Sequence, residues 1–355
     1  MYTILITGGC GFVGSNLAIL LKSKYPGYNI ICLDNLKRRG SELNLPRLSA
    51  REIRFLHGDI RNKEDLQLDE KIDFVIDAAA EPSVLAGTDT GADYLVNTNF
   101  MGTVNTLNQA VRAGARFVFL STSRVYAIKP LQQISYRESD TRFEIEEKQS
   151  IPGIGKEGVS EAFPVNQSRS LYGATKLASE LMIEEFGEFF GVDYVINRCG
   201  VIAGPYQMGK VDQGVVALWL ARHFWKRPVT YIGFGGKGKQ VRDVLHIHDL
   251  FDLVDYQLHH FESVKGQTFN AGGGVGCSVS LKELTDLCSM VSGNTVKEDA
   301  ILDNRKADVP LYITDNSKIT AATGWRPKRT MNDVVTDTYT WLHENEHQLE
   351  KILNA

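Results

Sequence analysis

The sequence predicts an α/β protein built on a doubly wound parallel sheet, with a smaller C-terminal domain interleaved with it. Short apolar runs bounded by turn residues alternate with segments of helical periodicity over roughly the first 200 residues. A glycine-rich turn directly follows the first of these runs, and no repeat interrupts the pattern. Strands that alternate with helices pair in parallel, and the helices then cover both faces of the sheet.

The predicted strands are short and apolar throughout, as expected for strands that are buried on both faces. They span Tyr2–Thr7, Asn29–Asp34, Ile53–His57, Phe74–Asp77, Phe117–Ser121 and Asp193–Asn197. Apolar residues at helical spacing predict helices between them, for example over Phe12–Lys24 and Asn97–Ala113. We therefore expect one dinucleotide-binding domain over residues 1–199.

The periodic pattern is lost over residues 127–170, where charged residues mix with Pro and Gly. Long irregular segments in compact domains are functional lids or flexible surface, and we favour a lid because a candidate catalytic helix follows. From residue 200 to 355, scattered helical and strand patterns with Gly-rich turns predict a smaller substrate domain. Its boundary with the first domain is expected to be interleaved.

The composition excludes several classes of function. The 355 residues include 39 Lys and Arg against 43 Asp and Glu, a net charge of −4, which argues against nucleic acid as the main partner. We expect no signal peptide, because no basic segment precedes an apolar run after Met1, and no apolar stretch approaches the ~20 residues that span a bilayer. The five cysteines are scattered and form no CxxC pair, which is typical of a reduced, cytoplasmic protein.

The glycine-rich turn predicts a Rossmann-type dinucleotide site. It reads TGGCGFVG over residues 7–14, between a predicted strand and a predicted helix. Glycines let the backbone turn sharply and approach a pyrophosphate, which then meets the unpaired N–H groups of the helix N-terminus. The residues expected to bind the cofactor here are Gly8, Gly11, Phe12, Val13 and Gly14.

The acid at the end of the second strand selects the coenzyme. Asp34 stands 20 residues after Gly14, where a carboxylate binds the adenosine ribose diol and repels a 2′-phosphate. The sequence therefore favours NAD. Three cations that follow closely, Lys37, Arg38 and Arg39, leave NADP open as the disfavoured alternative.

A tyrosine and a lysine supply the candidate catalytic pair. Tyr172 and Lys176 open a helical run and lie four residues apart, which places them on one helix face. A nearby ammonium lowers the pKa of a phenol, so the pair can take a hydroxyl proton while hydride leaves the carbon. Upstream, a predicted strand ends in hydroxyl residues that include Thr122, which can hydrogen-bond the substrate oxygen.

Motifs over most of the chain resemble those of the extended short-chain dehydrogenase/reductase family, whose members include nucleotide-sugar epimerases and dehydratases. The motifs are TGGCGFVG, LDNL, HGDI, STSRVY, YGATK, QVRDVLHIHDL and GWRP, and they occur in the family's order. The resemblance implies further coenzyme contacts from Asn35, Asp59, Ile60, Ala78, Ala80 and Asn99, together with Tyr172 and Lys176. It also implies that Thr122 and Tyr172 share the acid–base work, with Lys176 orienting.

The same resemblance implies substrate contacts from Ser123, Arg124, Arg242 and Arg305. The last two would hold the substrate diphosphate, because a planar guanidinium matches paired phosphate oxygens. Structural salt bridges to Asp243 or Asp308 are the alternative.

The residues after Thr122 favour epimerisation over dehydration. The family's dehydratases carry an Asp-Glu pair there, whereas this chain carries Ser123-Arg124. The RYFN-like segment usual in UDP-galactose 4-epimerases is also replaced, by Arg198-Cys199-Gly200-Val201. A UDP-hexose 4-epimerase, an NADPH-dependent ketosugar reductase and a non-catalytic nucleotide-sugar binding protein remain open.

Two histidine patterns are not assigned to a metal. The HExxH match at residues 343–347 has no third ligand after it and is expected to be a solvated terminal helix. In His246-Ile247-His248, strand alternation is expected to put both rings on one strand face. Family resemblance also implies a homodimer, built from the helix that contains Leu181–Phe190 and the helix from Asn97.

Overall fold

The structure is a computed structural model that describes residues 1–83, 86–87, 91–209, 213–305 and 307–354. Two compact units share the chain. The first comprises Met1–Val125, Leu171–Arg198 and Phe251–Phe269, and the second comprises Tyr126–Ser170, Cys199–Leu250 and Asn270–Ala355. The units are interleaved in sequence, and their division into coenzyme and substrate domains stays a prediction. Among the described residues, no helix combines the length and apolarity that crossing a bilayer requires.

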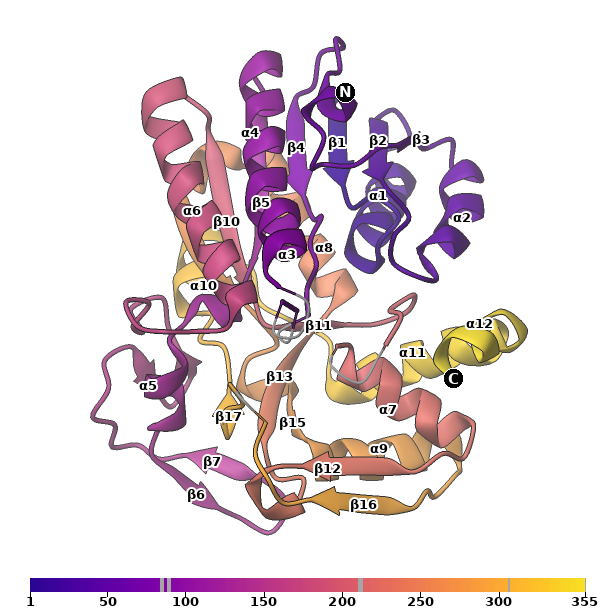
Figure 1. Ribbon diagram of the computed structural model, residues 1–355, viewed down its shortest axis with the longest axis vertical. Coiled ribbons are helices and arrows are strands. Elements are labelled where there is room, and N and C mark those ends of the chain that lie inside the picture. Colours follow the sequence, from indigo (N-terminus) through magenta and orange to yellow (C-terminus); the bar gives the residue numbers. More distant parts are fainter. Residues whose placement is uncertain (84–85, 88–90, 210–212, 306, 355) are drawn as a thin grey trace. The chain divides into compact units, whose positions relative to one another are not determined.

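A seven-stranded sheet forms the centre of the first unit (Figure 1). Its strands in chain order are β1 (Thr3–Thr7), β2 (Asn29–Asp34), β3 (Arg54–His57), β4 (Phe74–Asp77), β5 (Arg116–Thr122), β10 (Tyr194–Cys199) and β14 (Gln267–Ala271). Their spatial order is β14-β10-β5-β4-β1-β2-β3, and the pairs of β1 with β2 and β4, of β2 with β3 and of β4 with β5 are parallel. The predicted doubly wound parallel sheet is confirmed.

Helices connect these strands. They are α1 (Phe12–Lys24), α2 (Leu45–Ser49), α3 (Asp93–Val96), α4 (Gly102–Ala113), α6 (Leu171–Phe190) and α8 (Ile247–His259). The segment Asn97–Ala113 is helical as predicted, but the helical run begins earlier, with α3, and its turn at Asn97–Met101 is π-helical. Apolar periodicity does not distinguish a π turn from an α turn, and such turns are frequent at functional sites.

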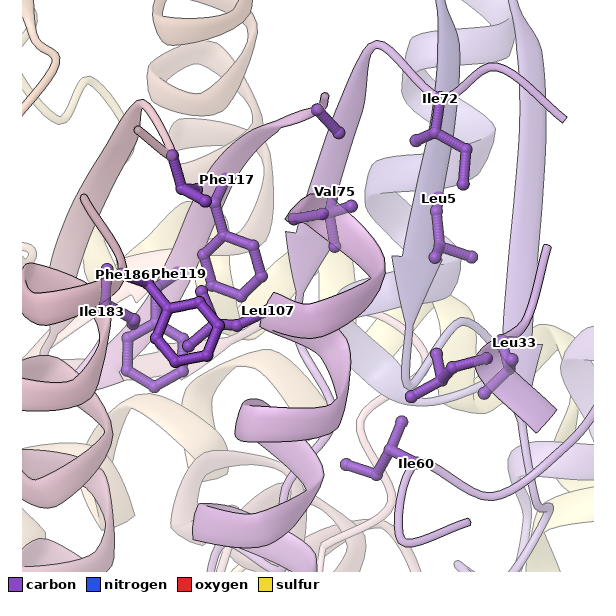
Figure 2. Packing of buried hydrophobic residues seen from close by; sticks show 14 of the residues in the cluster. Leu5, Leu33, Ile60, Ile72, Val75, Leu107, Phe117, Phe119, Ile183 and Phe186 are labelled. Carbon is purple, nitrogen blue, oxygen red and sulfur yellow. The ribbon is translucent and has the colours of Figure 1, made fainter. Parts of the chain in front are cut away.

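One apolar core cluster of the first unit lies between the sheet and the two helices α4 and α6 (Figure 2). Val75 and Phe117 contribute from neighbouring strands, Leu107 from α4, and Ile183 and Phe186 from α6. All five side chains are buried, and on α4 and α6 the spacing of 3–4 residues turns one apolar stripe of each helix onto the sheet. This packing fixes α6 against β5, the strand that ends at Thr122.

The second unit is built around β13. Its strands are β6 (Tyr136–Glu138), β7 (Phe143–Ile145), β8 (Ile154–Gly155), β9 (Gly158–Val159), β11 (Val201–Ala203), β12 (Val229–Ile232), β13 (Val241–His246), β15 (Ser278–Ser280), β16 (Glu298–Ile301) and β17 (Leu311–Tyr312). Its helices are α5 (Ile128–Gln132), α7 (Val215–Phe224), α9 (Leu281–Ser292), α10 (Ser317–Thr323), α11 (Met331–Glu344) and α12 (Glu346–Leu353). Strand β13 pairs with β11, β15 and β17. An apolar cluster contributed by α7, α9 and α11 packs with these strands.

The irregular segment 127–170 is part of this second unit and contains α5 and two short hairpins. It is anchored by backbone bonds: the N–H of Phe143 donates to Lys239 O at 2.9 Å, and that of Val159 donates to Ile313 O at 2.8 Å. The Ser280 hydroxyl, at the N-cap of α9, donates to Thr141 O at 2.8 Å. A role as a lid stays a prediction.

Candidate coenzyme site and catalytic helix

The glycine-rich turn brings the end of β1 against the start of α1. Gly8 has φ +64°, and a Cβ added to it would lie 2.9 Å from Ala78 O. A Cβ on Gly14 would lie 2.3 Å from Gly8 O, so a larger residue forces the helix away from the turn. No side chain caps α1 at Gly11, which leaves the amides of its first turn, including those of Phe12 and Val13, to a bound anion. The cradle fits a dinucleotide diphosphate.

A buried carboxylate holds this turn in place. Asp77 accepts the Thr7 hydroxyl at 2.6 Å and the Thr103 hydroxyl at 2.9 Å, and thereby joins the ends of β1 and β4 to α4. No local sequence pattern indicates this contact. The two hydroxyl partners explain how a carboxylate stays buried here. The half-buried Ala78 and Ala80 follow directly, where the backbone passes Gly8.

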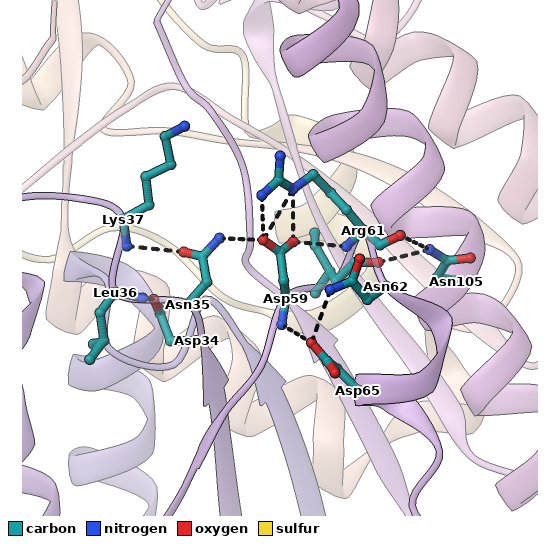
Figure 3. Close-up of polar contacts among 10 residues, drawn as sticks. Asp34, Asn35, Leu36, Lys37, Asp59, Arg61, Asn62, Asp65 and Asn105 are labelled. Carbon is teal, nitrogen blue, oxygen red and sulfur yellow. Dashed lines mark hydrogen bonds and ion pairs between the residues drawn. The ribbon is translucent and has the colours of Figure 1, made fainter.

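Asp34 ends β2, and backbone amides donate to both of its carboxylate oxygens; Figure 3 shows it beside Leu36. Its carboxylate accepts Leu36 N at 2.8 Å and Cys10 N at 3.0 Å. Burial raises the pKa of Asp34, and these N–H groups act in the opposite direction. The carboxylate is therefore fixed beside the glycine-rich turn, as a contact to the adenosine ribose requires.

The neighbouring loops are tied together around Asp59, as Figure 3 shows. The Arg61 guanidinium binds the Asp59 carboxylate with two nitrogens, the nearer at 2.6 Å, and Asn35 Nδ2 donates to it at 2.9 Å. The Arg61 hydrogen bonds hold the pKa of Asp59 below its usual range. Asn105 Nδ2 donates to Ile60 O at 2.8 Å and so fixes the next residue. The loop predicted to lie beside adenine is thus held at the Asp59 side chain and at the Ile60 carbonyl.

The Tyr94 ring of α3 lies close to two cations. The Lys37 ammonium lies 3.7 Å from the centroid of the Tyr94 ring, and the Arg61 guanidinium carbon lies 5.1 Å from the same centroid. Both distances are within the range of cation–π attraction. Lys37, one of the three cations that left NADP open, is therefore placed against an aromatic ring of α3.

The candidate catalytic pair lies on α6 with both side chains buried. Tyr172 is 9% exposed and Lys176 is 2% exposed. The helix packs against β5 and against the 3₁₀ turn Ser123–Val125 that follows it. Thr122 ends β5, is 8% exposed and accepts Arg124 N at 3.2 Å. The predicted hydroxyl thus ends a strand that packs against the helix carrying the predicted phenol and ammonium, and the catalytic roles of the three residues stay predictions.

Asn99, in the π-helical turn, hydrogen-bonds both backbone groups of Glu81 in the loop after β4. Its Oδ1 accepts Glu81 N at 2.8 Å, and its Nδ2 donates to Glu81 O at 3.0 Å and to Thr175 Oγ1 at 3.3 Å. The Ser179 hydroxyl donates to Asn99 O at 3.1 Å. Asn99 therefore joins this loop to α6, which is a structural task in addition to the predicted coenzyme contact.

Two further buried side chains, neither of them among the predicted site residues, contact the candidate catalytic helix. Glu180, one turn after Lys176, binds Arg198 of β10 and Ser121 of β5. Phe119 of β5 lies under the Lys176 ammonium. The repeat of Tyr172, Lys176 and Glu180 at four-residue spacing was the available signal for Glu180, whereas nothing local indicated Phe119.

The two predicted diphosphate-binding arginines belong to the second unit. Arg242, on β13, forms an ion pair with Asp308 at 2.9 Å and donates to Val309 O at 2.8 Å. The salt bridge weighed as an alternative is thus present. Arg305 precedes the residue at 306, which lies outside the described residues. Their roles toward a substrate stay predictions.

A cluster of His246, His248 and Asp337 has a spacing that fits a metal ion, with ligand atoms within 4.8 Å of one another. The expectation that both histidines lie on one strand face is wrong, because β13 ends at His246 and His248 belongs to α8. His246 Nδ1 accepts His248 N at 3.1 Å, so in the neutral ring Nε2 carries the proton and faces Asp337 at 3.3 Å. This arrangement favours a histidine–carboxylate pair over a metal site.

The HExxH match does not lie on one helix. The helix α11 ends at Glu344, α12 begins at Glu346, and both His343 and His347 are exposed. The expected solvated helix is therefore two helices separated at Asn345.

Comparison with known proteins gives consistent matches over most of the chain. The profile of the NAD dependent epimerase/dehydratase family matches residues 4–272. The CDP-paratose 2-epimerase of Salmonella typhi is 34% identical over 352 residues, covering 95% of this chain and 98% of that protein. The UDP-glucose 4-epimerase of Halalkalibacterium halodurans is 29% identical, covering 97% and 96%. Among solved structures, DesIV, a dTDP-glucose 4,6-dehydratase from Streptomyces venezuelae with NAD bound, has a TM-score of 0.77 and 28% identity, covering 99% of each chain.

Replacing Gly14 by Ala tests the glycine-rich cradle. The added Cβ must displace either α1 or the Gly8 carbonyl, so we expect NAD affinity to fall by about 10-fold or more. Equilibrium dialysis of the NAD-free protein measures this. Gly27→Ala is the matched control in the same unit, because its Cβ would meet only the flexible end of Met1 at 3.2 Å. Unchanged affinity in Gly14→Ala would contradict the assignment.

The buried His246 makes stability depend on pH. Burial, and the neighbouring His248 next, lower the pKa of His246 to about 4, so the folded protein favours the neutral ring. The contribution of the neutral ring to the free energy of unfolding is fully present above pH 6.5. It is lost as the pH falls toward about 4, because the unfolded chain then binds a proton that the folded protein does not. The variant His246→Asn keeps an acceptor for His248 N but does not titrate. Between pH 7 and pH 5 we expect its free energy of unfolding, measured in urea, to fall by about 2 kcal/mol less than that of the parent protein. His347→Asn, at an exposed position, is the control, and an unchanged pH slope in His246→Asn would exclude this origin.

Proposed function

Since the chain belongs to the NAD dependent epimerase/dehydratase family, we propose that it inverts one stereocentre of a nucleotide sugar by transient oxidation and re-reduction. Members of this family are NAD-dependent enzymes that act on nucleotide sugars, and NAD is the coenzyme of this chain. The observation that supports epimerisation is the buried Tyr172–Lys176 pair on α6, combined with Ser123-Arg124 in place of an acidic pair after Thr122.

Each catalytic residue has a separate task in the proposed reaction. NAD, when bound, accepts a hydride from the sugar carbon and later returns it. The Tyr172 phenolate takes the proton of the sugar hydroxyl and gives it back, while the Lys176 ammonium favours the phenolate by its charge. The Thr122 hydroxyl hydrogen-bonds the same sugar oxygen. The keto sugar turns over between the two hydride transfers, so the hydride returns to the opposite face.

Dehydration is the reaction of several similar proteins, and the residues beside Thr122 argue against it here. Elimination of water needs an acid and a base at the carbons next to the ketone. The 3₁₀ turn that follows Thr122 offers Ser123, a neutral hydroxyl, and Arg124, a permanent cation. Neither is suited to act as the base.

We propose CDP-paratose, or a closely similar CDP-linked deoxysugar, as the substrate, with inversion at C2. The support is the 34% identity to the CDP-paratose 2-epimerase over nearly the full length of both chains. The sequences STSRVY, DTRFE and GKQVRDVLH belong to the same resemblance. Arg242 and Arg305 would bind the diphosphate. The 29% identity to a UDP-glucose 4-epimerase makes 4-epimerisation of a UDP-hexose the second candidate.

We also propose that the protein is a homodimer that pairs through α6. This helix exposes large apolar side chains at Leu181 (57%), Phe189 (73%) and Phe190 (60%). Met101, in the π-helical turn, is 41% exposed. Exposed apolar side chains that recur along one helix are typical of a surface covered by a partner.

Replacing Tyr172 by Phe tests the acid–base assignment. We expect turnover to fall by about 10²–10⁴-fold, because the variant keeps the ring and loses only the proton donor and acceptor. NMR of the product measures turnover, and release of bound NAD on denaturation shows that the coenzyme is retained. Tyr256→Phe, on α8, is the control. Full activity in Tyr172→Phe would refute the mechanism.

Reaction in D₂O distinguishes hydride return from enolisation. The hydride that leaves the sugar carbon returns to it, so we expect the product to carry no solvent deuterium on carbon. CDP-, UDP-, GDP- and dTDP-hexoses are each incubated with the protein in D₂O. NMR of the products gives their deuterium content. The same spectra show which nucleotide sugar reacts and which carbon is inverted. Deuterium at the inverted carbon would show that the proton there exchanges with solvent, which contradicts the proposal.

A further inference from the structure

One buried face of α6 carries three polar side chains at four-residue spacing. Tyr172, Lys176 and Glu180 are 9%, 2% and 2% exposed. Residues four apart on a helix lie one above the other, so the three side chains share one face. The helix packs against β5. Burying an ammonium costs free energy unless neighbouring groups compensate for its lost hydration. The groups around Lys176 therefore determine whether its side chain stays charged.

An aromatic ring provides part of that compensation. The Lys176 Nζ atom lies 3.8 Å from the centroid of the Phe119 ring. Phe119 belongs to β5 and is fully buried. The negative face of an aromatic ring attracts a cation, and the attraction is stronger where water is excluded. An aliphatic side chain of similar size would fill the same space without this attraction.

The next contact along the same face fixes the helix. Two residues beyond Phe119 on β5, the Ser121 hydroxyl donates to Glu180 at 2.5 Å. Arg198 of β10 binds the same carboxylate through Nη2 at 2.7 Å and through Nε at 3.1 Å. The charge of Glu180 is thus matched by Arg198, and α6 is attached to two neighbouring strands.

We propose that Phe119 is a positioning residue that keeps Lys176 charged and in place, one helical turn from the Tyr172 phenol. The inference rests on the proposed function, in which the Lys176 charge favours the Tyr172 phenolate. Phe119 touches neither substrate nor coenzyme in this role and acts only through Lys176.

Other charged or titratable groups occur on the elements that pack against α6: Asp93 and Tyr94 on α3, Arg112 on α4, Arg116 on β5 and Arg124 after β5. Several of them have partners elsewhere. Arg112 donates to Leu66 O at 3.0 Å, Arg116 pairs with Glu262 at 3.5 Å, and Tyr94 holds Lys37. The contact with Phe119 is therefore the feature to vary.

The experiment is a titration of the Tyr172 phenol in the NAD-loaded protein. Phenolate absorbance is recorded against pH for each protein and for its Tyr172→Phe counterpart, and the difference belongs to Tyr172. In Phe119→Leu we expect the midpoint to rise by about 0.5–1 pH unit, because an ammonium without its ring partner is less well placed and less charged. Phe119→Tyr keeps the ring and is expected to titrate like the parent protein.

The matched control is Phe117→Leu. Phe117 is on the same strand, is also fully buried and undergoes the same change of side chain. We expect no shift of the Tyr172 midpoint in this variant. A normal midpoint in Phe119→Leu, or an equal shift in Phe117→Leu, would overturn the role of the Phe119 ring. If Phe119→Leu does not fold, Phe119→Met tests the same point with a side chain of similar volume that adapts better to an irregular space.

A further variant separates this inference from the proposed function. Lys176→Met removes the ammonium itself and is expected to raise the Tyr172 midpoint more than Phe119→Leu does. If Lys176→Met leaves the titration unchanged, the catalytic pair of the proposed function is wrong. If Lys176→Met raises the midpoint and Phe119→Leu does not, only the role of Phe119 is wrong.

Discussion

The close approach of α1 to the end of β1 is the constraint on which the candidate site depends. A single methyl group on Gly14 would lie 2.3 Å from the Gly8 carbonyl oxygen, so the helix reaches this position only with glycine there. The Asp77 carboxylate fixes the other side of the turn by holding hydroxyls of β1 and α4. Because Asp34 also accepts an amide of this turn, the first two strand ends form one rigid edge.

Patterns that are local in sequence were predicted well. The strands β2 and β4 and the helix α1 have the predicted bounds, since a buried strand or an amphipathic helix shows its period within a few residues. The glycine-rich turn was recognised for the same reason. The π-helical turn at Asn97–Met101 was not, because its extra residue per turn leaves no mark in the apolar spacing.

The contacts that support the site join residues far apart in the chain, and a single sequence does not pair them. Asp77 meets Thr7 across 70 positions, and Asn99 meets Glu81 across 18. The placement of His248 on a strand was wrong because alternation was continued past the strand's last residue, where α8 begins. The ion pair of Arg242 with Asp308 was foreseen only as an alternative.

The interleaved order of the two units has a consequence for genetic manipulation of this chain. Each unit is assembled from three separate stretches, so no single truncation yields either one as a continuous fragment. Exchanging one unit for that of a relative would require three simultaneous transplants. Recombination between two relatives at one crossover point would instead leave units assembled from stretches of both parents. A change that exchanges one unit must therefore treat the chain as a whole, although the chain forms two compact units.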